Sequence, residues 1–114
     1  MFNRQSLFKL GAGISIIVAF YHFIGIFYPV SAAPPYRHAL FTIINLLCFF
    51  GFVKRPKYFI IFFSILFVQQ IYSHGGSLIR HWKDFGTIDW IDLFVIILLP
   101  IFFINLILDW KSRF

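Results

Sequence analysis

The sequence predicts an all-α protein, a four-helix transmembrane bundle, from its apolar content, its low charge and the length of its apolar runs. Hydrophobic residues make up 61% of the 114 residues, and charged residues make up 12%. Soluble domains contain about 45–50% apolar and about 25% charged residues. A water-soluble globule of this composition would expose large apolar patches. The composition therefore excludes an ordinary soluble domain and indicates that lipid surrounds the chain.

Four apolar runs are each long enough to cross a membrane as one helix. A helix rises about 1.5 Å per residue and a bilayer core is about 30 Å thick, so about 20 apolar residues span it. The predicted spans cover about residues 10–28, 36–53, 58–76 and 91–108. The loops between them are too short to form a separate domain, which predicts a single integral membrane domain over residues 1–114.

Prolines, glycines and basic residues mark the expected ends and weak points of these helices. Prolines between residues 29 and 35 end the first span, because proline lacks the N–H that a continuing helix needs. A Lys-Arg-Pro-Lys stretch at 54–57 ends the second. The sequence leaves open whether the third helix continues through the Gly75–Gly76 pair. Pro100 predicts a kink in the fourth helix.

A secretory signal peptide is the rival interpretation of the first run. Val30-Ser31-Ala32 resembles a small-residue cleavage site that follows an apolar stretch. The run from Leu10 to Tyr28 is 19 residues long and contains His22, whereas the apolar region of a signal peptide has about 7–15 residues. We therefore expect a spanning helix here.

The distribution of basic residues predicts the orientation of the chain. Seven lie in the two terminal tails and the central turn, namely Arg4, Lys9, Lys54, Arg55, Lys57, Lys111 and Arg113. Three lie on the other side, namely Arg37, Arg80 and Lys83. Because positive residues are retained on the cytoplasmic side, both termini are expected to be cytoplasmic, in a bacterial inner membrane. The net charge of +6 is thereby explained by topology, and no nucleic-acid partner is expected.

Small and polar side chains recur at helical spacing along one face of three spans. Such residues mark the faces where membrane helices pack, since lipid already satisfies the apolar faces. The first face carries Gly11, Ser15, Val18, His22 and Gly25; the second carries His38, Thr42 and Asn45; the third carries Gln70, His74, Ser77 and His81. We expect these three faces to lie inside the bundle.

Depth in the membrane is estimated by counting about 1.5 Å per residue from the basic boundaries. The count places two layers of polar side chains in the outer half of the bundle. The deeper layer holds His22, Thr42 and Gln70, and the outer layer holds His38, His74 and Asp92. The sequence therefore predicts a polar pocket that opens to the outside.

This pocket admits three interpretations. The side chains form hydrogen bonds that hold the helices together, or they line a site for a quinone, a lipid or another apolar molecule. The ligand-binding residues are then His22, Thr42, Gln70 and Asp92. In the third interpretation, His38 and His74 bind a transition metal or a haem iron, since imidazole is the commonest metal ligand. Arg37 and Arg80 are placed to pair with haem propionates.

Catalytic motifs are missing from the sequence. It has no Ser, His and acid at motif spacing and no glycine-rich phosphate loop, and its single cysteine, Cys48, lies within a span. A cation site on the outer face, from His81 with the aspartates at 84, 89 and 92, competes with a solvated loop. We expect a non-catalytic accessory subunit or a homo-oligomeric membrane component. The alternative is a binding or redox protein that holds a metal, haem, quinone or lipid.

The order of the predicted elements resembles the DoxX-like group of small bacterial membrane proteins. The features that carry the resemblance are four short spans, a polar loop after the first and a basic turn after the second. That group typically has an acidic residue in its second span, where this chain has Asn45. The resemblance therefore implies a four-span architecture and transfers no activity or site residue.

Overall fold

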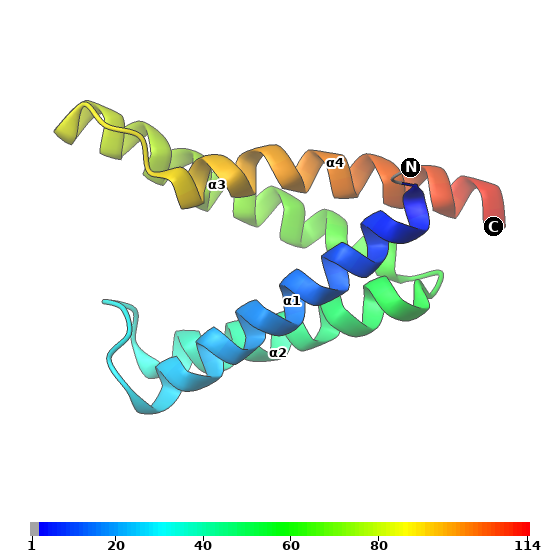
Figure 1. The fold of residues 1–114 in the computed structure, drawn as a ribbon, viewed down its shortest axis with the longest axis horizontal. Coiled ribbons are helices and arrows are strands. Elements are labelled where there is room, and N and C mark those ends of the chain that lie inside the picture. The colour runs from blue at the N-terminus through cyan, green and yellow to red at the C-terminus, as the bar shows by residue number, and fades with distance from the viewer. Residues whose placement is uncertain (1–2) are drawn as a thin grey trace. The chain divides into compact units, whose positions relative to one another are not determined.

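The computed structural model describes residues 3–114, which form four helices and no strand. The helices are α1 (Arg4–Phe27), α2 (Pro35–Lys54), α3 (Phe59–Phe85) and α4 (Trp90–Arg113) (Figure 1). Each helix is long and apolar enough to cross a membrane. The predicted all-α class and the four candidate spans are therefore confirmed.

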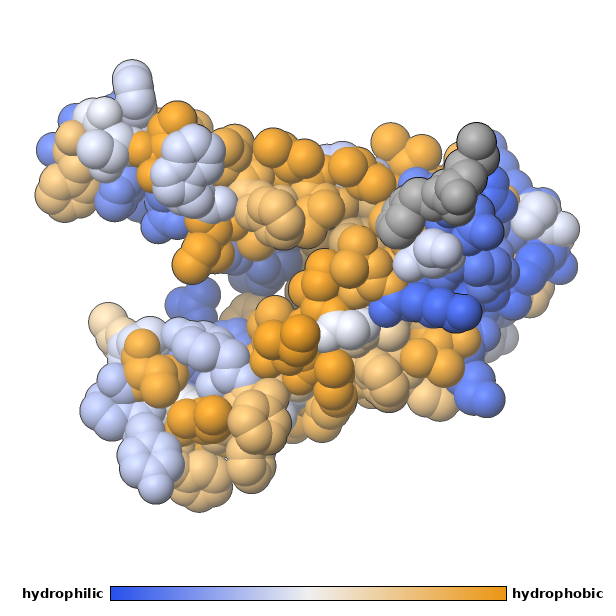
Figure 2. Space-filling view, viewed as in Figure 1, coloured by the Kyte–Doolittle hydropathy of each residue, from blue (hydrophilic) through white to orange (hydrophobic). Residues whose placement is uncertain are grey.

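Contacts divide the chain into two compact units, Met1–Pro56 and Lys57–Phe114. Each unit is a pair of antiparallel helices, which we call the N-terminal hairpin (α1 and α2) and the C-terminal hairpin (α3 and α4) (Figure 1). Short loops make this pairing the simplest one, because consecutive membrane helices run in opposite directions. Apolar side chains gather along the middle of the helices (Figure 2).

Local sequence signals account for the helix ends. Asn3 caps α1 by accepting a hydrogen bond of 2.8 Å from the backbone N–H of Ser6, and Asp89 caps α4 in the same way. Short polar side chains satisfy the N–H groups that the first turn of a helix leaves without partners. Gly86 caps the C-terminal end of α3 and adopts a left-handed conformation at φ 66° that glycine accepts without strain.

Helix α3 is longer than the predicted span of residues 58–76. It continues without a break through Gly75 and Gly76 and ends at Phe85, which answers the question that the sequence left open. The side chain of Ile96 on α4 lies 3.7 Å from the position that a Cβ on Gly75 would take, so the glycine is packed against the partner helix. Tertiary packing of this kind offsets the low helix propensity of glycine.

Aromatic and small residues form the contacts inside each hairpin. In the N-terminal hairpin, Phe8 and Phe52 are buried and stacked with 6.3 Å between ring centroids. In the C-terminal hairpin, Phe103 stacks on Phe67 at 4.6 Å and contacts Phe63 at 6.2 Å. Offset aromatic pairs at such distances add about 0.5–1.5 kcal/mol each beyond the area they bury.

Candidate functional site

The N-terminal hairpin contains a histidine cluster formed by His22, Ser31 and His38. His22 lies in α1, His38 in the first turn of α2, and Ser31 in the loop between them. The two Nδ1 atoms of the histidines are 2.9 Å apart, and the Nε2 of His38 is 3.0 Å from the Ser31 hydroxyl. The Ser31 oxygen also accepts the backbone N–H of Ala33 at 3.2 Å. His38 is only 2% exposed, whereas His22 is half-buried and Ser31 is exposed, so the hairpin encloses the His38 ring alone.

These contacts constrain the protons on both rings. Of the two facing Nδ1 atoms, one must carry the hydrogen and the other must offer its lone pair. Both ring nitrogens of His38 are therefore engaged with protein groups. A chain of hydrogen bonds runs from the Ala33 backbone through Ser31 and His38 to His22, and it fixes the loop onto both helices.

The geometry of the cluster bears on the predicted cofactor role of His38. Metal–imidazole bonds are about 2.0–2.1 Å long, so two axial ligands on opposite sides of one ion need nitrogens about 4 Å apart. The 2.9 Å between His22 and His38 is too short for that arrangement. Among residues 3–114, moreover, no three His, Cys, Asp or Glu side chains gather as a metal site. The observed arrangement of this cluster fits hydrogen bonding.

Gly25 provides the space that the His38 ring occupies. A Cβ on Gly25 would lie 2.6 Å from both Cγ and Nδ1 of His38, which is far closer than van der Waals contact. The ring therefore packs directly on the backbone of α1. The Tyr21 ring lies edge-on to the His38 ring at 6.0 Å between centroids, and Phe41 stacks on His22 at 5.5 Å.

The C-terminal hairpin contains a second polar contact, the His74–Asp92 pair. The Nδ1 of His74 on α3 lies 2.6 Å from Oδ1 of Asp92 in the first turn of α4. Asp92 is 5% exposed, and its Oδ2 is buried with no hydrogen-bond partner among the described residues. A carboxylate only accepts hydrogen bonds, so the Nδ1 of His74 must be the donor. The Nε2 of His74 then remains available for a ligand.

Thr42 and Gln70, the other predicted ligand-binding residues, form local hydrogen bonds. The hydroxyl of Thr42 donates to the His38 carbonyl of its own helix at 2.8 Å. The Nε2 of Gln70 donates to Oε1 of its neighbour Gln69 at 2.6 Å. A hydroxyl in a membrane helix commonly satisfies itself on the preceding turn in this way.

The structure brings four of the six predicted site residues together as two separate pairs, and Thr42 and Gln70 form the local hydrogen bonds described above. His22 contacts His38, although the depth count placed them in different layers. The counted depths differ by only three residues, or about 4.5 Å of helix rise, which two imidazole side chains can bridge. His74 contacts Asp92 within the predicted outer layer. His38 and His74 belong to different hairpins, and their pairing around one ion stays a prediction.

The arginines assigned to haem propionates contact their own helices. The guanidinium of Arg37 lies 5.7 Å from the Phe41 ring centre. Arg80 folds back over Gly76, where its Nη1 would be 3.0 Å from an added Cβ.

Ser31 was not predicted as part of any ligand-binding or metal site. The sequence signal for it was weak, because only its place beside the prolines, in a turn close to His38, distinguishes it from other loop serines.

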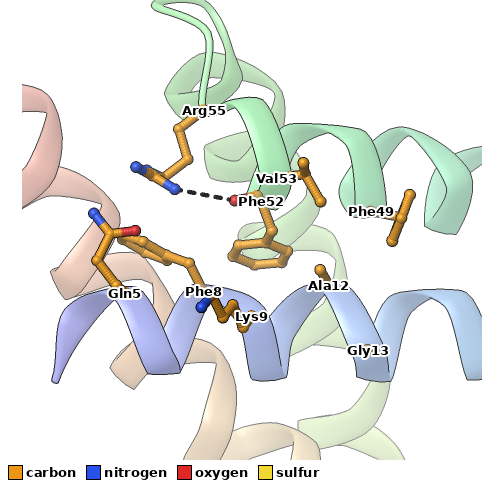
Figure 3. A pocket seen from close by; sticks show the side chains of 9 residues that line it. All are labelled: Gln5, Phe8, Lys9, Ala12, Gly13, Phe49, Phe52, Val53 and Arg55. Atoms are coloured by element: carbon orange, nitrogen blue, oxygen red, sulfur yellow. Dashed lines mark hydrogen bonds between the residues drawn. The ribbon is translucent and has the colours of Figure 1, made fainter. Parts of the chain in front are cut away.

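The N-terminal hairpin also has a groove at the end opposite its histidine cluster, where α1 begins and α2 ends. It has a volume of about 390 Å³ (Figure 3). Its lining residues are Gln5, Phe8, Lys9, Ala12, Gly13, Phe49, Phe52, Val53 and Arg55. The sequence does not predict this groove, because its lining residues show no motif.

The helices and their two polar clusters define the class of this protein as an all-helical chain with four candidate membrane-spanning helices. No protein-family model matches the chain, and comparisons with curated proteins and with solved structures gave no match either.

Proposed function

We propose that this chain is a non-catalytic, multi-pass component of a bacterial inner membrane that works within an assembly. It acts either as an accessory subunit of a larger complex or as a homo-oligomer, with both termini in the cytoplasm. The first support is the way its histidines are used. The hydrogen bonds of His22, His38 and His74 tie helix to helix or helix to loop within their own hairpins, which is a structural role.

The exposed amide side chain of Gln69 is the single observation that carries the proposal. Gln69 lies ten residues into α3, about 15 Å from the start of the helix and near the middle of a bilayer core about 30 Å thick. Its side chain is exposed on the C-terminal hairpin, where it meets only the Gln70 amide among the described residues. Amides in lipid favour hydrogen bonds to another helix. We assign this partner to a helix of another chain, and the single-cysteine crosslink below separates it from the N-terminal hairpin of the same chain.

Cysteine crosslinking in native membranes tests this proposal. The chain has one cysteine, the buried Cys48, so Gln69→Cys is made in a Cys48→Ala background. We expect an oxidised adduct, either a dimer at twice the mass of the chain or a larger product with a partner protein. Val68→Cys is the matched control, since Val68 is exposed at the same depth but points about 100° away around the helix. Absence of any Gln69→Cys adduct, with the protein present in the membrane, rejects the proposal.

A second candidate function rests on the unpaired Oδ2 of Asp92. A buried carboxylate oxygen without a partner is costly, and in a membrane such groups commonly mark a functional site. Together with the Nε2 of His74, it offers an acceptor pair to a proton, a cation or the polar group of a quinone. This second candidate restricts the predicted ligand-binding site to His74 and Asp92 of the C-terminal hairpin.

Analysis of what copurifies with the protein decides between the two functions. An absorption spectrum, elemental analysis and mass spectrometry of extracted small molecules are measured on the full chain in mild detergent. The ligand-binding alternative predicts a near-stoichiometric cofactor that His74→Ala and Asp92→Asn lose. If His38 also binds it, His38→Ala loses it as well. A ligand-free wild-type protein that stays free after haem, metal and quinone are added back removes the alternative.

A further inference from the structure

We infer that the groove of the N-terminal hairpin is a binding site for one anionic phospholipid. Basic and polar side chains lie at the end of the groove nearest the start of α1, and apolar side chains line the rest (Figure 3). Gln5, Lys9 and Arg55 form the polar end, and Gly13 and Phe49 lie at the other end (Figure 3). This order of groups matches a molecule with a charged head and an apolar tail.

The polar end is strongly electropositive. Lys9 is exposed, and Arg4, Lys54 and Arg55 belong to the same end of the hairpin. Residues 1–56 include no aspartate or glutamate, so the side-chain charges that this hairpin itself contributes are all positive. Basic residues beside a membrane attract anionic lipids, so positive charge next to the apolar groove favours a lipid with a net negative headgroup over a zwitterionic one.

The position of Arg55 is fixed by two contacts. Its Nη1 donates to the Phe52 carbonyl at 3.3 Å, and its guanidinium lies 4.8 Å from the centre of the Phe8 ring. The backbone of Arg55 adopts a left-handed conformation, with φ 44°, where α2 ends. The guanidinium is thereby held at the polar end, and Lys9 reaches the same region from α1.

The apolar part of the groove has the size and lining that an acyl chain needs. Its floor consists of the buried side chains of Phe8, Ala12 and Phe52, and its walls are the exposed Phe49 and Val53. Gly13 leaves one side open, because a Cβ at this position would meet no atom within 4 Å. A volume of about 390 Å³ lies within the range of about 300–1,000 Å³ typical of small-molecule sites.

Native mass spectrometry of the full chain in uncharged detergent tests the site. Phosphatidylglycerol and phosphatidylcholine with identical acyl chains are titrated separately, and inorganic phosphate is added as a free-anion competitor. We expect one tightly bound phosphatidylglycerol, weaker binding of phosphatidylcholine and no competition by millimolar phosphate. Lys9→Gln is expected to weaken phosphatidylglycerol binding about fivefold, since it removes one basic residue beside the lipid surface. Lys111→Gln, an equal loss of charge outside the groove, leaves binding unchanged.

Two substitutions at Gly13 separate the tail site from simple charge attraction. Gly13→Leu fills the open side of the groove and is expected to abolish the tightly bound lipid, whereas Gly13→Ala changes the backbone in the same way without filling it. Equal binding of the two lipids overturns the inference, and so does identical behaviour of Lys9→Gln and Lys111→Gln. Competition by phosphate together with undiminished binding in Gly13→Leu assigns the polar end to free anions instead.

Discussion

His38 shows how one buried imidazole organises a membrane hairpin. Its two ring nitrogens contact α1 through His22 and the connecting loop through Ser31, and its ring packs on the bare backbone of Gly25. Each contact depends on the others, because the ring reaches both hydrogen-bond partners only while it lies directly on Gly25. The loop between residues 28 and 34 is thereby tied to the helices by side chains.

Replacing Gly25 by alanine should therefore destabilise the N-terminal hairpin. The added methyl group would lie 2.6 Å from the His38 ring, which forces the ring away from His22 and Ser31. Overpacking of this kind costs about 1–3 kcal/mol. Thermal unfolding of the purified protein in detergent measures the effect. Gly13→Ala is the control, since its methyl group enters open space and helix propensity alone favours it by up to about 1 kcal/mol. Equal stability of the two variants would contradict this account of His38.

At this scale the sequence predicts part of the inward face and not which residues touch. On the predicted face of α2, His38 and Thr42 are buried and Asn45 is half-buried. On α3 the buried residues are Phe59 and Phe63, outside the predicted face. The depth count did not predict the contact between His22 and His38, because side-chain length and rotamer decide contacts over the last few ångströms. The role of Ser31 was not predicted, because a loop has no helical or strand periodicity.

Helix α3 shows that hydropathy does not decide where a helix ends. Its apolar pattern fades after residue 72, so the sequence predicts a span to about residue 76, yet the helix continues to Phe85. Hydropathy reports which residues suit lipid, and it does not report where the backbone stops being helical. The stop is set by Gly86 in its left-handed conformation, a signal that the sequence analysis did not use.

A continuous α3 predicts that alanine is tolerated at Gly75. The new methyl group would lie 3.7 Å from the Cδ1 of Ile96, which is ordinary van der Waals contact. Replacing a glycine by alanine in a helix interior raises the free energy of unfolding by about 0.5–1 kcal/mol. Gly75→Ala should therefore raise the unfolding temperature and slow amide hydrogen exchange around residues 73–80. Gly75→Leu, whose larger side chain meets Ile96, should lower it. A loss of stability in Gly75→Ala would indicate that α3 bends or breaks at this pair.

The molecule as a whole is predictable at the level of composition. Its apolar content and low charge predict a membrane protein, and its four long apolar runs predict four helices, because lipid-exposed backbone must satisfy its own hydrogen bonds. Its division into the two hairpins Met1–Pro56 and Lys57–Phe114 is not visible in that composition. The division depends on which inward faces are complementary, and small and polar stripes of similar spacing on three helices do not specify their partners.

The orientation of the whole chain is open to a direct test by cysteine accessibility. Seven basic residues lie on one side of the four predicted spans and three on the other, and the positive-inside rule then predicts that both termini lie in the cytoplasm. In a Cys48→Ala background, Ala32→Cys in the first loop should react with a membrane-impermeant maleimide in intact cells whose outer barrier has been permeabilised. Ser112→Cys, near the end of α4, should react only after the inner membrane is opened. Labelling of Ser112→Cys but not of Ala32→Cys in intact cells means the opposite orientation, and labelling of both means that fewer than four helices cross.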